Sequence, residues 1–136
     1  MIKFMLDTDI CSYIMREKPI QVLERFDTHE MEQFCISIIT YAEFKYGVLR
    51  SPNPKKHHRL VKHFILHVDI VPWDRSAADS YADIRQTLES RGHTIGNMDM
   101  MIAAHARSLG FTLVTNNEKH FKRVPDLKIE NWTKIV

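Results

Sequence analysis

Short, almost uninterrupted apolar runs alternate along this chain with longer stretches in which apolar residues recur every three or four positions. A short run of this kind is typical of a strand buried on both faces, whereas the three-to-four spacing is typical of an amphipathic helix. The runs predict strands over 2–6, 34–39, 68–71 and 111–114, followed by a short edge strand, LKIEN, at 127–131.

Capping residues mark where the helices between these runs begin. Asp9 is predicted to cap the first helix, and Thr40, with Glu43 three residues later, matches a T-x-x-E capping box. Asn97 is predicted to cap the helix before the fourth strand. Because apolar strands alternate with helices, we expect a single α/β domain over residues 1–136, with a mainly parallel central sheet flanked by helices.

The composition fits a globular protein with no membrane span. The apolar fraction of 44% and the charged fraction of 26% are ordinary for a soluble domain. No apolar run approaches the roughly 20 residues that cross a bilayer. The first run carries Lys3 and ends at Asp7, unlike a secretory signal, so a cytoplasmic location is expected. Cys11 and Cys35 lie among apolar neighbours and are expected to be buried free thiols.

Positive charge is concentrated in one segment, although the net charge of the chain is only +2. The segment between Glu43 and Asp69 contains no acid. A solvated helix face explains such a run, and so does attraction to the phosphates of a nucleic acid, so charge alone does not decide between them. The candidate RNA-binding residues in this segment are Lys55, Lys56, Arg59 and Lys62.

Three acids fall where predicted strands and helices meet. Asp7 directly follows the first strand, Glu43 lies one turn into the helix after the second, and Asp99 lies in the first turn of the helix that leads to the fourth. The capping box explains Glu43 locally, and the helix dipole explains Asp99. Since ligand-binding residues in a parallel sheet gather at the carboxyl ends of its strands, however, we expect the three to converge.

Converging carboxylates would repel one another and raise one another's pKa values unless a cation were present. Mg²⁺ and Mn²⁺ prefer such oxygen ligands. A carboxylate-bound Mg²⁺ beside a basic surface is the arrangement that phosphodiester hydrolysis needs. The sequence therefore predicts a metal-dependent nuclease site.

Ordered blocks across nearly the whole chain resemble the PIN-domain toxins called VapC. The blocks are FMLDTDICSYIM, ISIITYAEFKYG and IGNMDMMIAAHARSLGFTLVTNN. The resemblance implies an endoribonuclease of a type II toxin–antitoxin system that cleaves RNA with Mg²⁺ or Mn²⁺. It implies that Asp7, Glu43 and Asp99 are the catalytic and metal-binding residues.

The resemblance also implies partners and a substrate. Its members are usually dimers bound to a VapB-type antitoxin, which lays a C-terminal arm across the toxin and puts an Arg into the acidic pocket. The leading substrate is initiator tRNA, cut in its anticodon stem-loop, with inhibition of translation as the result.

The chain departs from the family pattern after the fourth strand. Many PIN domains have a fourth acid there, whereas this chain has Asn116 and Asn117, whose amide oxygens could ligate but add no charge. His120 stands where close relatives often have Glu.

Two alternatives stay open at this point. One is a catalytically weak PIN module that binds RNA or protein. The other is a haloacid-dehalogenase-like phosphatase, with Asp7 as nucleophile and Asp9 as acid.

Overall fold

A single sheet of parallel strands forms the centre of the computed structural model, which describes residues 2–134. The strand order is β3-β2-β1-β4-β5, so β1 is central. The strands are β1 (Phe4–Leu6), β2 (Phe34–Ser37), β3 (Asp69–Val71), β4 (Thr112–Val114) and β5 (Ile129–Glu130). The predicted α/β domain is confirmed, and the mainly parallel sheet is parallel at every pairing.

The strand order reverses at β1: strands that follow it in sequence are added first on one side and then on the other, so the switch point lies between β1 and β4. From β1 the chain moves outward to β2 and β3, and it then returns to the other side of β1 with β4 and β5. In open α/β sheets, ligands bind at such a switch point, outside the carboxyl ends of the strands. The order therefore places a candidate site at the ends of β1 and β4.

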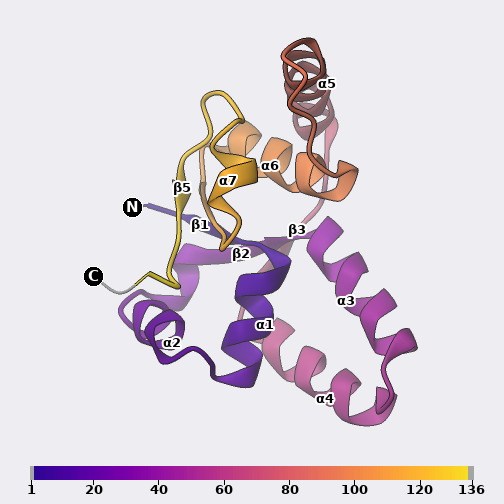
Figure 1. Cartoon of the computed structure of the whole chain (residues 1–136). Helices are drawn as coiled ribbons and strands as arrows, with labels where there is room; N and C mark the ends of the chain where they lie inside the picture. Colours follow the sequence, from indigo (N-terminus) through magenta and orange to yellow (C-terminus); the bar gives the residue numbers. More distant parts are fainter. Residues whose placement is uncertain (1, 135–136) are drawn as a thin grey trace.

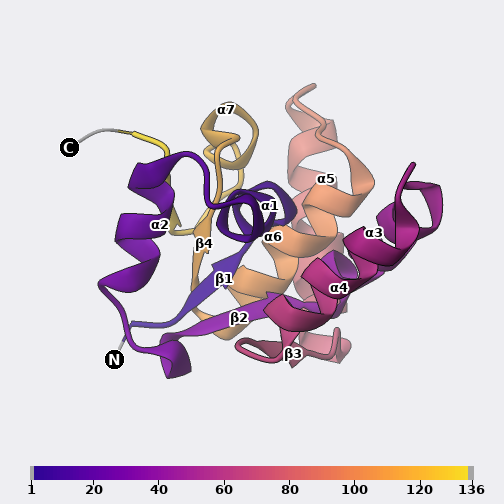
Figure 2. The same ribbon diagram turned by 90° about the horizontal axis from the view of Figure 1, so that it is seen from below.

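Helices cover both faces of the sheet (Figure 1). Helices α1, α2 and α4 lie on one face and α5, α6 and α7 on the other, while α3 runs outward from the end of β2 (Figures 1 and 2). No helix in residues 2–134 is long and apolar enough to cross a membrane. The helices are α1 (Thr8–Arg16), α2 (Ile20–Asp27), a 3-10 turn (Met31–Gln33), α3 (Ile38–Arg50), α4 (Pro54–Ile65), α5 (Arg75–Ser90), α6 (Asn97–Leu109) and α7 (Glu118–Phe121).

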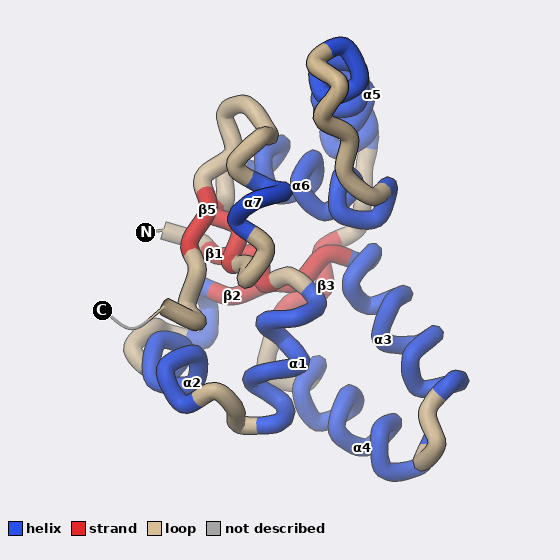
Figure 3. The backbone as a smooth tube through the Cα atoms, viewed as in Figure 1, coloured by secondary structure: helices blue, strands red, loops and turns tan. Residues whose placement is uncertain are grey.

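Two apolar cores follow from the alternation of side chains along each strand. Phe4 and Leu6 point into the core under α1, α2 and α4, whereas Met5 between them points into the core under α5 and α6. The strands lie between these two layers (Figure 3). Trp132 is fully buried in the first core, with its ring centroid 5.5 Å from that of Phe4. The strand ends are thus held on both sides by packed helices.

The second strand is shorter than predicted, and the predicted capping box is wrong. Helix α3 begins at Ile38, and its N-cap is Ser37, whose hydroxyl accepts the Ile39 N–H at 3.1 Å. Thr40 is buried inside the helix, so it cannot cap it. The strand ends early because a serine supplies the acceptor that the first turn of a helix needs. Glu43 consequently lies in the second turn of α3 rather than at its start.

Two further caps differ from the prediction. Asp7 rather than Asp9 caps α1, since its carboxylate accepts the Ile10 N–H at 2.9 Å and the helix begins immediately after β1. Gly96 rather than Asn97 precedes α6, because its carbonyl already accepts the Met100 N–H at 2.9 Å. The acid at the end of β1 therefore both caps a helix and faces the switch point.

Candidate active site

Asp7 lies at the switch point of the sheet and is almost inaccessible to solvent, with 6% of its surface exposed. Its backbone N–H donates to the Val114 carbonyl at 3.0 Å, which extends the pairing of β1 with β4. Burial raises the pKa of Asp7 to about 7, and the negative charges of Asp9 and Asp99 add to the rise. Hydrogen bonds from the Thr115 side chain and the Ile10 N–H oppose it. A buried carboxyl group of this kind is typical of a functional site.

Glu43 comes from α3 and Asp99 from α6, and both side chains are partly buried. Burial is the main cause that raises the pKa of each. The charge of Asp99 raises the pKa of both Asp7 and Glu43. Asp99 therefore links the other two carboxylates into one electrostatic unit.

Asp9 is a fourth member of this unit; the sequence predicted it as a helix cap and as the acid of the phosphatase alternative, but not as part of the metal site. Its charge raises the pKa of Asp7, Glu43 and Asp99. The signal was present in the sequence, because Asp9 is two residues after a strand-ending acid and lies in the first turn of α1. We refer to Asp7, Asp9, Glu43 and Asp99 as the acid cluster.

Two threonine hydroxyls orient these carboxylates. Thr8 Oγ1 donates to Glu43 Oε1 at 2.5 Å, which joins α1 to α3. Thr115, fully buried directly after β4, bonds the Asp7 side chain and accepts the Asn117 N–H at 2.9 Å. Neither threonine stood out in the sequence, since each needs the folded sheet to meet its partner.

The two asparagines after β4 differ in where their side chains lie. The Asn116 amide donates to the Tyr13 hydroxyl at 3.2 Å and accepts from the Thr133 hydroxyl at 2.9 Å. Asn117 Nδ2 lies 2.8 Å from Nδ1 of His120. That same ring nitrogen is 4.0 Å from Asp99 Oδ2, and His120 opposes the rise in the Asp99 pKa. Asn117 thus approaches the acid cluster through His120.

The candidate RNA-binding residues lie on α4, and all of them are exposed. Helix α4 packs beside α1, the helix that carries Asp9 (Figure 2). Within residues 2–134, none of the candidates forms an ion pair with an acid of the chain, so their charges are available to another molecule. The residues concerned are Lys55, Lys56, Arg59 and Lys62.

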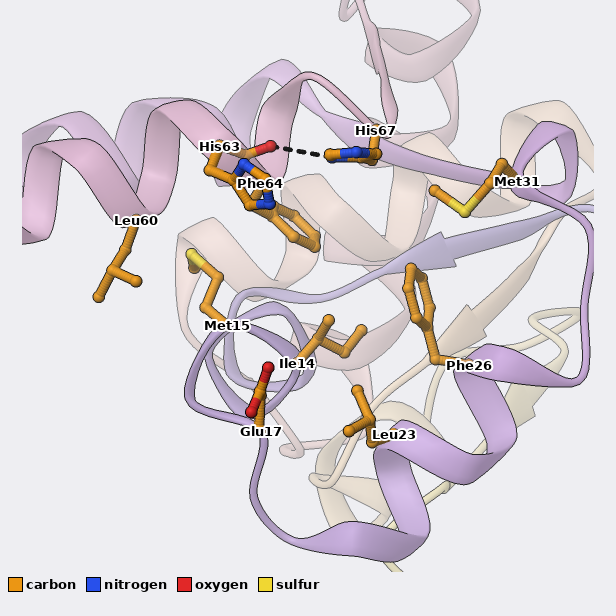
Figure 4. A pocket seen from close by; sticks show the side chains of 10 residues that line it. All are labelled: Ile14, Met15, Glu17, Leu23, Phe26, Met31, Leu60, His63, Phe64 and His67. Atoms are coloured by element: carbon orange, nitrogen blue, oxygen red, sulfur yellow. Dashed lines mark hydrogen bonds between the residues drawn. The ribbon is translucent and has the colours of Figure 1, made fainter.

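An apolar groove opens between α1, α2 and α4 (Figure 4). It has a volume of about 290 Å³, and its lining includes Ile14, Leu23 and Phe26. A neighbouring cavity of about 430 Å³ shares Met15 and Leu60 with the groove and reaches the acid cluster at its Asp9 wall.

The acid cluster fits a hard divalent cation by the chemistry of its donors. All four groups are carboxylates, and burial disfavours the ionised forms of Asp7, Glu43 and Asp99, so a bound cation would relieve a cost already present in the fold. Within residues 2–134, no three Asp, Glu, His or Cys side chains form a ready-made metal cage. Mg²⁺ does not need one, because it usually keeps several waters and binds one or two carboxylates.

Comparison with known proteins identifies relatives over almost the full length. The family model described as PIN domain matches residues 4–127. A tRNA(fMet)-specific endonuclease VapC from Shigella flexneri is 40% identical, covering 98% of this chain and all of that protein. Ribonuclease VapC2 from a strain of Haemophilus influenzae is 38% identical over 97% of this chain and 99% of its own.

A solved structure gives the same result in three dimensions. A crystal structure of DNA-bound VapBC from Salmonella typhimurium contains a chain that superposes with a TM-score of 0.90. The VapBC chain is 39% identical to this protein, and the match covers 97% of this chain and 99% of the VapBC chain.

Proposed function

Because this chain belongs to the PIN-domain family and is a VapC-type ribonuclease, we propose that it cleaves RNA with Mg²⁺ held by Asp7, Glu43 and Asp99. Mn²⁺ would serve in the same place. The phosphatase alternative is not supported, since the family that matches is a different one.

The convergence of carboxylates at the switch point carries this proposal. Four acids from three separate elements gather where β1 and β4 end, and three of them have raised pKa values. A structural role does not require a buried carboxylate such as Asp7 with like charges near it, which costs free energy in the absence of a counter-ion. A metal-binding catalytic role does explain them.

Different residues of the chain bind the metal and attract the RNA. Asp7 is fixed by the Ile10 N–H and by Thr115, and Glu43 is fixed by the Thr8 hydroxyl, so both carboxylates are oriented before any ligand binds. The exposed lysines and arginine of α4 attract the RNA backbone. When bound, Mg²⁺ lowers the pKa of a coordinated water and neutralises charge on the phosphate.

We propose tRNA as the substrate, and initiator tRNA cut in its anticodon stem-loop as the first one to test. Relatives from Shigella flexneri and Salmonella typhimurium carry the name tRNA(fMet)-specific endonuclease VapC and are 40% and 39% identical to this chain. Cleavage there would remove the tRNA that starts translation. The same enzyme would then act as a toxin in the cytoplasm.

We propose a VapB-like antitoxin as the partner that restrains this activity, with an arm that places an Arg at the acid cluster. The solved relative is a VapBC complex. The apolar groove suits the apolar side of such an arm. An Arg suits the acid cluster, because its planar guanidinium can bridge two carboxylates and does not lose its charge. We also propose a homodimer, which mass measurement by light scattering would test.

Cleavage of initiator tRNA by the purified chain tests the proposal. We expect cleavage with Mg²⁺, none with EDTA, and loss of most activity in Asp7→Ala and Asp99→Ala, with the double variant little worse than either single one. Asp79→Asn, an exposed acid on α5, is the control and should behave as the wild type. Full activity of both alanine variants would refute the site. RNA binding without cleavage would leave the catalytically weak module as the function.

A further inference from the structure

The cavity between α1 and α4 has walls unlike those of the apolar groove beside it. It encloses about 430 Å³, which is within the range of small-ligand pockets, roughly 300–1,000 Å³. Tyr13 and Arg16 line it from α1, and His57 lines it from α4. Its remaining polar walls are Ser12 and Asp9, the latter a member of the acid cluster. The cavity therefore combines a ring, a guanidinium and an imidazole directly beside the proposed site of cleavage.

Tyr13 and Arg16 lie together on the α1 wall of this cavity. The Arg16 guanidinium carbon lies 5.4 Å from the centre of the Tyr13 ring. The Tyr13 hydroxyl accepts the Asn116 amide N–H at 3.2 Å, which ties the ring to the loop after β4. Tyr13 is half-buried, so the cost of ordering this side chain has largely been met by the fold.

Flat aromatic and guanidinium surfaces are the groups on which proteins stack the unpaired bases of RNA. We propose that this cavity binds one unstacked base of the RNA substrate, on a nucleotide adjacent to the phosphate at the acid cluster. This inference rests on the proposed ribonuclease function. It adds a subsite that selects single-stranded RNA, because a base within a duplex is stacked and paired and cannot enter.

The charges of the cavity favour RNA over the arm of an antitoxin as its occupant. Arg16 and the acid-free helix α4 lie on either side of the opening, and both attract phosphate and repel a cationic arm. The apolar groove offers a peptide the burial that this cavity does not. A base, with an apolar face and a polar edge, fits the mixture of Tyr13, His57 and Asp9.

A series of short single-stranded RNAs that each lack one base provides the test. With the wild-type chain, we expect one abasic position next to the cleavage site to raise KM by about 5- to 100-fold, with little change in kcat. Tyr13→Ala should raise KM for the intact RNA by a similar factor. In Tyr13→Ala, removing the base should not raise KM any further, because the ring on which that base stacks is already absent.

Two further variants distinguish the contribution of the Tyr13 ring from those of its hydroxyl and of Arg16. Tyr13→Phe keeps the ring and should retain a KM near that of the wild type. Arg16→Gln, at an exposed position, should raise KM even if Tyr13→Ala fails to fold. Tyr46→Ala is the matched control, since Arg50 lies at the same 5.4 Å over the Tyr46 ring on α3 but Tyr46 does not line this cavity.

The inference is overturned if both Tyr13→Ala and Arg16→Gln leave KM unchanged, or if the abasic effect persists in Tyr13→Ala. It is also overturned if these variants weaken the antitoxin complex alone, in which case the cavity belongs to the arm. Failure of the wild-type chain to cleave any RNA would contradict the proposed function instead.

Discussion

Ser37 and His105 are joined by a fully buried hydrogen bond of 2.8 Å between the serine Oγ and the histidine Nδ1. Ser37 caps α3, which carries Glu43, and His105 lies six residues after Asp99 on α6. Burial lowers the pKa of His105, which favours the neutral ring. This bond joins the start of α3 to α6, the two helices that carry Glu43 and Asp99.

Removing either partner of this bond should reduce stability. We expect Ser37→Ala and His105→Ala each to lower the free energy of unfolding by about 1–3 kcal/mol, because each leaves a buried polar group unpaired. The double variant should lose less than the sum, with a coupling of about 0.5–3 kcal/mol. Urea denaturation measures this, and His93→Ala, at an exposed position, is the control. Strict additivity would show that the bond contributes nothing.

The metal-free protein should lose stability as the pH rises from about 4 to 8. The pKa of Asp7 is about 7 in the folded chain against 3.8 ordinarily, so in this range the folded state binds more protons than the unfolded state. Stability therefore falls with rising pH, by up to about 4 kcal/mol from this group. Asp7→Asn should abolish most of this loss and still cap α1, since Asn is an equally good N-cap.

Mg²⁺ should reverse the effect of pH in the wild type but not in Asp7→Asn. Thermal melts at pH 5 and pH 8, with and without Mg²⁺, measure both results. A melting temperature of the metal-free wild type that rises from pH 5 to pH 8 would contradict the buried, protonated Asp7.

The basic face of α4 should control the affinity for RNA rather than the chemical step. Replacing Lys55, Lys56 and Arg59 with Gln should weaken binding and reduce the slope of log K against log salt by about one per lost phosphate contact. Filter binding at several salt concentrations measures the slope. The charge-matched control replaces Arg75, Arg85 and Arg91 on or after α5, across the sheet. If the α4 variant keeps the wild-type salt slope for RNA binding, the basic face of α4 binds something other than RNA.

A cognate antitoxin should inhibit the chain through one arginine. Co-purification with the partner encoded beside it should give an inactive complex, since an Arg at the acid cluster excludes both metal and RNA. Changing that Arg to Ala should restore part of the cleavage while the complex stays assembled, because the groove contacts remain. An Arg→Ala complex that is as inactive as its parent would place the inhibition elsewhere.

The fold was predictable because the chain marks its strands with short apolar runs and its connections with caps. The expectation that Asp7, Glu43 and Asp99 converge followed from parallel topology, and the effect of Asp99 on the pKa values of Asp7 and Glu43 agrees with it. The exact cap residues could not be predicted, because two residues near the start of each helix can each accept its first N–H groups. The caps observed are Asp7, Ser37 and Gly96, whereas those predicted were Asp9, Thr40 and Asn97.

Neighbours across the fold could not be predicted. Thr8 and Glu43 are 35 residues apart, and Ser37 and His105 are 68 apart. Such pairs depend on how the helices pack against the sheet, which no local pattern encodes. The place of Asp9 beside the three predicted acids was missed for the same reason, because its charge acts on carboxylates of other elements.

The anomalous difference map of a crystal soaked in Mn²⁺ tests the central claim most directly. The account predicts a strong peak at the switch point of the sheet, with oxygen ligands from Asp7, Glu43 or Asp99 within about 2.0–2.6 Å of the ion. The peak should disappear in crystals of Asp99→Asn if that carboxylate is a ligand. A fully soaked wild-type crystal with no peak at the acid cluster, or with its only ordered ion elsewhere, would contradict the account.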